Sequence, residues 1–364
     1  MRIVQLANFW TPTSGGLRTV LDRLAAGYAE RGHRVLQVVP GERDEHRPTA
    51  WGRRVTVSSP LLPGGGGYRV IVRLRHVQRL IAGQAADVVE ISDRATLAHL
   101  ATRLRGDTPR TVLVAHERLD HIVPAGAYGA AERVVRPIAD RWNPRCWRGV
   151  DEIVTPSRFA ADEWHRVGIV PTVVPWGVDL EVFRPDAGER AIGGPHLCWV
   201  GRLAPEKRPG LAIDTLASLV ADDVPAELTI VGDGPMRHEL EVAARGLPVC
   251  FVGHVADPRV VATHLRSSTV TLSTSGIETF GLSVLESLAC GTPVVTVEGG
   301  AASEVAATAG RICAPDAGAI AAAVHTLVES PIAVQTARRR AEHFTWDRAV
   351  DAMLSVHDPA RVAA

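Results

Sequence analysis

One order of elements occurs twice in this chain and restricts the folds that it can adopt. An apolar strand is predicted over Ile3–Leu6, followed by a loop containing Gly15 and Gly16, an amphipathic helix to about Arg31 and a strand over Arg34–Val39. The second half repeats this scheme, beginning with a strand predicted over Leu197–Val200. Strands that alternate with helices form parallel sheets, because each helix crosses over between neighbouring strands. The sequence therefore predicts an α/β protein with two Rossmann-like domains.

The length of 364 residues is sufficient for two domains of ordinary size. We predict a first domain over 1–184, a polar linker over 185–194 that contains Pro and Gly, and a second domain over 195–343. An amphipathic helix is expected in the remaining segment, 344–364, from Thr345 to about His357.

Composition and cysteine usage favour a cytoplasmic protein. Apolar residues make up 46% of the chain and charged residues 22%, as is typical of soluble globular proteins. No apolar run reaches ~18 residues and no leader precedes the first strand, so neither a membrane span nor a signal peptide is predicted. The five cysteines are scattered without metal-binding spacing, which indicates reduced thiols.

The charge is unevenly distributed between the two halves. Residues 1–194 carry 27 Arg and 21 acidic residues, net +6, whereas residues 195–364 are net −6. This asymmetry favours an anionic partner for the first half, although chance explains it equally well. A helix predicted over Tyr68–Ile81, after a mobile loop at Gly64–Gly67, could lie on an anionic membrane surface or pack in the core with a solvated arginine face. Its cations are Arg69, Arg73, Arg75 and Arg79. No nucleic-acid partner is predicted.

The segment from Glu278 to Gly291 has the features of an anion site between two carboxylates. Its apolar spacing predicts a helix that begins near Gly281, with Glu278 before it and Glu286 inside it. First-turn amides have no partner within a helix, and the helix dipole adds positive potential there. Such a site suits a diphosphate, and the carboxylates could bind hydroxyls on either side, as in a sugar nucleotide. An ordinary surface helix with two solvated glutamates is the alternative.

The cations of the second half point to the same chemistry. Of 40 Lys and Arg residues, 39 are Arg, and the single lysine, Lys207, shares a strand-to-helix loop with Arg202. Cations in such a loop can bind phosphate. The chain contains no Asp-x-Asp pair, so we predict that no metal ion holds the diphosphate.

Polar residues also follow two predicted strands of the first half. Asp93 and Arg94 follow the strand over Asp87–Ile91, and His116 follows the strand over Thr111–Ala115. In open α/β sheets, ligands bind at the carboxyl ends of the strands. These residues are therefore candidates for the acceptor side of a site, although His116 could simply cap a strand end.

Several motifs together resemble a known family. The Gly15-Gly16 loop in the first half, the Gly-Arg-x4-Lys motif that ends at Lys207 and the Glu-x7-Glu motif that begins at Glu278 resemble the retaining GT-B glycosyltransferases of family 4. Within this family, the chain resembles the actinobacterial GDP-mannose-dependent α-mannosyltransferases that act on phosphatidylinositol or other glycolipids. The segments that carry this closer resemblance are Gln5–Phe9, Ser14–Thr19, His116–Asp120, Gly177–Asp179 and Glu278–Leu282. The resemblance covers nearly the whole chain, and it implies that the last helix crosses back onto the first domain.

The resemblance also implies roles for individual residues. His116, Arg202, Lys207 and Glu278 would form the catalytic set: His116 would face the sugar, the two cations would hold the phosphates, and Glu278 would bind a sugar hydroxyl. Glu286 would bind the ribose, and His254 would lie near the base. The further donor-binding positions would be the backbone of Gly15, Gly16, Gly253, Phe280, Gly281 and Leu282.

The predicted reaction is transfer of a mannosyl group from GDP-mannose to a hydroxyl of a lipid-linked acceptor, with retention and without a cofactor. The enzyme would be cytoplasmic or peripheral at the inner face of the membrane. One alternative is transfer from a UDP-sugar, such as UDP-N-acetylglucosamine, to a soluble acceptor such as an aminocyclitol. A sugar-nucleotide 2-epimerase, also built of two α/β halves, and a non-catalytic membrane scaffold stay open as well.

Overall fold

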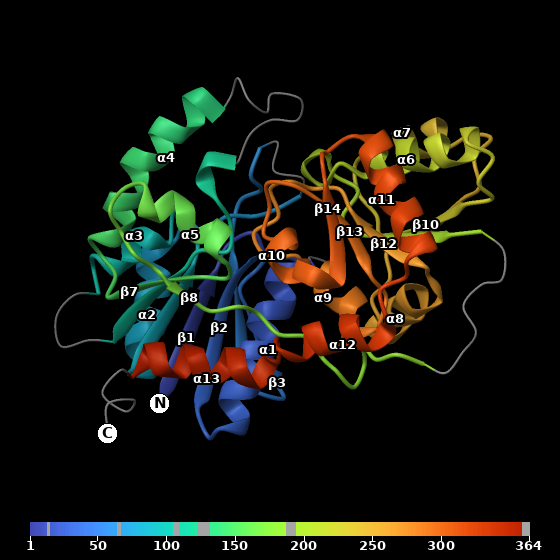
Figure 1. The fold of residues 1–364 in the computed structure, drawn as a ribbon. Coiled ribbons are helices and arrows are strands. Elements are labelled where there is room, and N and C mark those ends of the chain that lie inside the picture. Colours follow the sequence, from blue (N-terminus) through green and yellow to red (C-terminus); the bar gives the residue numbers. More distant parts are fainter. Residues whose placement is uncertain (13–14, 64–66, 105–108, 122–131, 187–193, 359–364) are drawn as a thin grey trace. The chain divides into compact units, whose positions relative to one another are not determined.

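The computed structural model describes residues 1–12, 15–63, 67–104, 109–121, 132–186 and 194–358. The chain divides into two compact units. Unit 1 comprises Met1–Pro175 together with Trp346–Ala364, and unit 2 comprises Trp176–Thr345 (Figure 1). The predicted linker, 185–194, lies later in the chain than this division, and 187–193 fall outside the described residues.

The sheet of unit 1 has the strand order β3-β4-β2-β1-β5-β6-β7-β8. All neighbouring strands are parallel except β3 and β4, which form an antiparallel pair at one edge. The central strand β1 pairs with β2 on one side and with β5 on the other. The bounds are β1 (Arg2–Ala7), β2 (Arg34–Gly41), β3 (Glu45–Thr49), β4 (Gly52–Ser58), β5 (Val88–Ser92), β6 (Arg110–Val114), β7 (Glu152–Thr155) and β8 (Thr172–Val173).

The helices of unit 1 bury apolar side chains against this sheet. Leu6, Ile91, Leu113 and Trp164 are almost fully buried in its core. The described helices are α1 (Gly16–Glu30), α2 (Leu74–Gln84), α3 (Ala98–Ala101), the 3-10 turn η1 (Leu119–His121), α4 (Glu132–Trp147), α5 (Arg158–His165) and α13 (Trp346–His357).

The C-terminal helix α13 packs on unit 1 beside α1, which confirms the predicted return of the last helix to the first domain (Figure 1). Its last residue, His357, is buried and its Nε2 lies 2.8 Å from Glu90 Oε1 of β5. Tyr28 and Gln5 also donate hydrogen bonds to the Glu90 carboxylate, at 2.6 and 2.8 Å. Burial alone would raise the pKa of Glu90, but His357 and the donors Tyr28 and Gln5 hold that pKa below its ordinary value.

The sheet of unit 2 is entirely parallel, with the strand order β11-β10-β9-β12-β13-β14. Numbered from its first strand, this order is 3-2-1-4-5-6, the doubly wound arrangement of nucleotide-binding folds. The strands are β9 (His196–Val200), β10 (Glu227–Val231), β11 (Val249–Gly253), β12 (Val270–Ser273), β13 (Val294–Val297) and β14 (Gly310–Cys313). The described helices are η2 (Pro205–Lys207), α6 (Pro209–Ala221), α7 (Arg237–Ala243), α8 (Pro258–Ser267), α9 (Leu282–Ala289), α10 (Ala302–Ala306), η3 (Ala307–Ala309), α11 (Ala317–Glu329) and α12 (Val334–Glu342).

The predicted basic helix begins later than its apolar pattern suggested. The prediction placed it over Tyr68–Ile81, whereas α2 spans Leu74–Gln84, so Arg69 and Arg73 precede it. The preceding segment is instead extended and paired, because the amide of Leu62 donates to the carbonyl of Tyr68 at 2.8 Å. Residues 64–66 of the loop predicted to be mobile lie outside the described residues.

None of the described helices is by itself long and apolar enough to span a membrane. Helices α11 and α12 satisfy the length and composition criteria only when taken together, and the chain bends by 113° between them.

Candidate active site

The donor residues predicted in unit 2 lie at the carboxyl ends of its strands, which all face the same side of the sheet. Arg202 and Lys207 follow β9, and Glu278 follows β12. These two strands are neighbours, and the strand order reverses between them. A reversal of this kind opens a crevice at the carboxyl ends of the strands, where doubly wound sheets bind ligands. Gly253 and His254, at the end of β11, lie on the same edge.

Lys207 and Glu278 meet at this point of reversal. Lys207 Nζ lies 2.5 Å from Glu278 Oε2, and the side chains are 32% and 23% exposed. Because both groups are partly accessible, each can still bind a ligand while it orients the other. The single lysine of the chain therefore lies beside the first carboxylate of the Glu278–Gly291 segment.

Two hydroxyl groups hold the lysine loop against the end of β12. Thr274 Oγ1 donates to the carbonyl of Lys207 at 2.8 Å and accepts a hydrogen bond from Trp199 Nε1 at 2.9 Å. Ser275 Oγ donates to the carbonyl of Glu206 at 2.9 Å. Sequence reasoning did not single out Thr274 or Ser275, although two hydroxyl residues directly after a strand at this edge were a usable signal.

The loop that carries Glu278 lies close to the loop that follows β13. A Cβ atom added at Gly276 would lie 2.7 Å from the carbonyl oxygen of Glu298, so only glycine fits there without a shift of the backbone. The amide of Ala301 donates to the carbonyl of Glu278 at 2.7 Å. Both contacts fix the backbone from which the Glu278 side chain extends.

Helix α9 begins one residue after Gly281, which adopts a left-handed conformation with φ +91. Gly281, the N-cap residue, has no side chain that could cap this end. That the first-turn amides bind an anion stays a prediction. The ring of Phe280 is buried against Phe344, with ring centroids 6.1 Å apart, so only its backbone could meet a ligand. Glu286 is half-buried on α9.

The predicted residues of unit 1 also lie at carboxyl strand ends. His116 follows β6, and its Nε2 lies 2.9 Å from Ser92 Oγ at the end of β5. Burial lowers the pKa of His116 to about 4; Glu90 opposes this shift and Arg94 adds to it. The imidazole is therefore neutral near pH 7 and can both donate and accept a hydrogen bond. Gly15, the N-cap of α1, and Gly16 are exposed.

Two residues predicted for the acceptor side have structural partners within unit 1. Arg94 is 7% exposed, and its Nη1 lies 2.5 Å from Glu163 Oε1. Asp93 is 5% exposed, and its carboxylate accepts hydrogen bonds from the amides of Ala95, Thr96 and Leu97 at 2.7 to 3.0 Å. Their buried charges are thus compensated by the fold itself, and their contact with an acceptor stays a prediction.

The arginines predicted to meet a membrane divide into two pairs. Arg69 forms an ion pair with Glu42 at 2.9 Å, and Arg73 forms one with Asp44 at 2.8 Å. Arg75 and Arg79 are exposed on α2. Because two of the four cations are paired with carboxylates, the cationic surface is smaller than the sequence suggested, and peripheral membrane contact stays a prediction.

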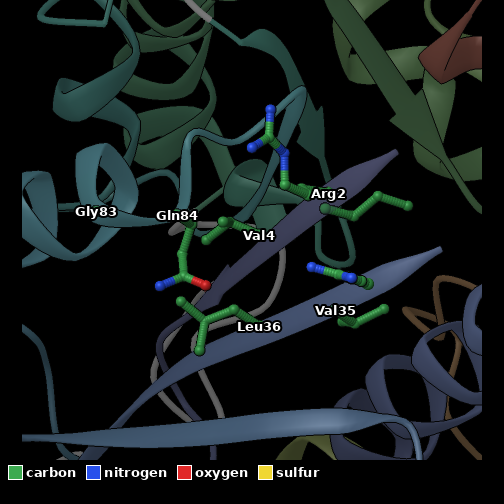
Figure 2. A pocket seen from close by; sticks show the side chains of 8 residues that line it. Arg2, Val4, Val35, Leu36, Gly83 and Gln84 are labelled. Carbon is green, nitrogen blue, oxygen red and sulfur yellow. The ribbon is translucent and has the colours of Figure 1, made fainter.

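A cavity of about 270 Å³ lies at the amino ends of strands in unit 1. Figure 2 shows it at the start of strands β1 and β2, near Gly83 and Gln84 of α2. Arg2 and Arg34, the first residues of these strands, also line it. Because it lies at the amino ends of the strands, it is separate from Ser92 and His116.

Among the described residues, no group of three or more His, Cys, Asp or Glu is arranged to hold a metal ion.

Comparisons with known proteins show the family to which this chain belongs. A family model described as Glycosyltransferase Family 4 matches residues 14–182, and one described as Glycosyl transferases group 1 matches residues 194–330. The chain therefore belongs to glycosyltransferase family 4, and the predicted class of enzyme is confirmed. Over 98% of its length it is 41% identical to the GDP-mannose-dependent alpha-(1-6)-phosphatidylinositol dimannoside mannosyltransferase of Mycobacterium tuberculosis (strain ATCC 25177 / H37Ra), and it covers 95% of that protein.

A more distant relative and two solved structures complete the comparison. The chain is 34% identical to a D-inositol 3-phosphate glycosyltransferase of Geodermatophilus obscurus over 52% of this chain and 47% of that protein. The sucrose-phosphate synthase of Thermosynechococcus elongatus superimposes with a TM-score of 0.81, with 18% identity and full coverage of both chains. Anabaena Alr3699/HepE in complex with UDP and glucose superimposes with a TM-score of 0.71, 18% identity and coverage of 98% and 99%. These structures confirm the predicted fold, two α/β domains of the GT-B type.

Proposed function

We propose that this protein transfers a mannosyl group from GDP-mannose to a hydroxyl of a phosphatidylinositol mannoside, with retention of the anomeric configuration. The observation that carries the proposal is the 41% identity, over 98% of the chain, to a mannosyltransferase with this donor and acceptor. The Lys207–Glu278 pair at the carboxyl edge of the unit 2 sheet supports it, because it places a cation and a carboxylate where a sugar nucleotide presents phosphate and hydroxyl groups.

Within this proposal, each part of the unit 2 site has one task. Lys207 and Arg202 stabilise the negative charge that develops on the departing diphosphate, together with the first-turn amides of α9. Glu278 binds a hydroxyl of the transferred mannose, and Glu286 binds the ribose. A diphosphate oxygen accepts the proton of the acceptor hydroxyl on the face from which the leaving group departs, which gives retention.

The proposed roles of the remaining residues concern the ends of the donor. Gly253 and His254 would contact the base, and His116 would contact the sugar as a neutral imidazole. Gly15 and Gly16 would present first-turn amides of α1 to the diphosphate.

A transfer assay with purified protein tests donor and acceptor together. The protein is incubated with phosphatidylinositol dimannoside in mixed micelles and with GDP-mannose, UDP-glucose or UDP-N-acetylglucosamine, and the lipid products are analysed by mass spectrometry and NMR. Only GDP-mannose is expected to give a lipid extended by one hexose, and the new linkage should have the α configuration of the donor.

Two control reactions separate the alternative activities. Free D-inositol 3-phosphate replaces the lipid in one, and the acceptor is omitted from the other. Transfer from a UDP-sugar to the soluble acceptor, with none from GDP-mannose to the lipid, would replace the proposed function by the soluble-acceptor alternative. Formation of a free epimerised sugar without acceptor would indicate an epimerase.

A further inference from the structure

Two successive hydrogen bonds link the buried side chain of Trp199, in β9, to the backbone of Lys207 in unit 2. Trp199 of β9 is 3% exposed, and Thr274, directly after β12, is 2% exposed. The indole Nε1 of Trp199 lies 2.9 Å from Thr274 Oγ1, which in turn lies 2.8 Å from the carbonyl oxygen of Lys207. These two hydrogen bonds connect the neighbouring strands β9 and β12 to the backbone of Lys207, whose ammonium group contacts Glu278.

The direction of these two hydrogen bonds is determined by chemistry. An indole N–H can only donate a hydrogen bond and a carbonyl oxygen can only accept one. The Thr274 hydroxyl must therefore accept from Trp199 and donate to Lys207, and both of its partners are specified. Hydrogen bonds in such a series strengthen one another, and each buried group would be left unsatisfied if the hydroxyl were removed.

The next residue reinforces the same loop. Ser275, which is 4% exposed, donates to the carbonyl of Glu206 at 2.9 Å. Two consecutive hydroxyls thus hold two consecutive carbonyls of the turn η2. The turn ends at Arg208 with φ +50, a backbone conformation that non-glycine residues adopt rarely and that needs support from the surrounding structure.

We infer that Thr274 is a positioning residue of the transferase: its hydroxyl, oriented by Trp199, fixes the backbone of Lys207 and so places the ammonium group opposite Glu278. The inference rests on the proposed function only in that Lys207 acts on the donor diphosphate. Thr274 itself touches neither substrate nor leaving group. Its contribution comes from geometry, since displacing a catalytic group by about 1 Å can lower a rate about 10²-fold.

Replacing Thr274 by valine keeps the shape of the side chain and removes both hydrogen bonds. We expect Thr274→Val to lower kcat for mannosyl transfer by about 10- to 100-fold. Thr274→Ser, which keeps the hydroxyl, is expected to recover most of the rate. In a Lys207→Ala background, Thr274→Val should cause no further loss, because residues that act as one unit are not additive.

Thr292 offers a matched control in the same unit. It is fully buried, and its hydroxyl donates to the carbonyl of Leu265 at 2.8 Å, but it lies before β13, at the amino-terminal edge of the sheet. Thr292→Val should lower the melting temperature about as much as Thr274→Val and leave kcat unchanged. Should Thr274→Val fail to fold, Trp199→Phe removes the donor to Thr274 and is expected to lower kcat in the same direction.

The outcomes separate the inference from the proposed function. If wild-type protein transfers mannose and Thr274→Val matches Thr292→Val in kcat, or if Thr274→Val lowers activity equally with and without Lys207, Thr274 has only a structural role. If wild-type protein transfers no sugar from GDP-mannose, the proposed function fails first. The inference is then tested with whichever donor the wild-type protein uses.

Discussion

Lys207→Ala is expected to reduce kcat/KM for mannosyl transfer by about 10²- to 10³-fold, the effect of removing one preorganised electrostatic group from an active site. Lys207 is the only lysine of the chain and forms an ion pair with Glu278 at the reversal of strand order in unit 2. In the proposed mechanism, its loss removes a cation from the leaving diphosphate, and it also removes the ion-pair partner of Glu278. Steady-state kinetics with varied GDP-mannose, at saturating acceptor, measure this loss.

Two further variants define the role of the ammonium group. Lys207→Arg keeps the charge but spreads it over a planar fork, so it should restore activity only in part. Arg245→Ala removes an exposed cation of the same unit and serves as the control, with wild-type kinetics expected. Near-wild-type activity of Lys207→Ala, alongside an unchanged Arg245→Ala, would mean that the diphosphate is held elsewhere.

Arg94→Ala should lower the free energy of unfolding by about 3–5 kcal/mol, the usual cost of breaking a buried ion pair from one side. Arg94 contacts Glu163 and Asn143, and its guanidinium lies 5.2 Å from the ring centroid of Trp164. Glu163 is fully buried, so its carboxylate would lose its countercharge while it still accepts a hydrogen bond from the amide of Leu119 at 3.0 Å. Urea denaturation followed by tryptophan fluorescence gives the change in free energy.

The double variant Arg94→Met with Glu163→Leu distinguishes a structural role from a role in acceptor binding. Replacing both charged partners by apolar residues removes the unpaired carboxylate, so stability should largely return. If Arg94 serves only the fold, transfer activity should return as well. Restored stability with activity still lost would instead assign Arg94 to the acceptor side, as the sequence first suggested.

The fold and much of the candidate site could be predicted because their signals are local. The alternation of apolar strands and helices indicates a parallel sheet, and the carboxyl ends of parallel strands meet at one edge. Lys207 and Glu278 are 71 positions apart, yet each follows a predicted strand, so both were placed at such an edge. The start of α9 was also predictable, because apolar spacing and Gly281 both mark it.

Other features depend on contacts that sequence patterns do not reveal. The pattern of Arg69 and Arg73 resembled a helix, but pairing of Leu62 with Tyr68 keeps that segment extended. Arg94 was predicted on the acceptor side because it follows a strand, and this role stays a prediction. Its ion pair with Glu163 was not predictable, because Glu163 lies on a helix far along the chain. Tertiary contacts override local propensity in such cases.

The crystal structure of the protein with GDP-mannose bound tests the central claim most directly. We expect the diphosphate to lie at the carboxyl edge of the unit 2 sheet, within hydrogen-bonding distance of Lys207 and of the first-turn amides of α9. Glu278 should then contact a hydroxyl of the mannose. Phosphates bound instead at the opposite edge of a sheet, for example beside Arg2 and Arg34 in the cavity of unit 1, would contradict this assignment of the donor site.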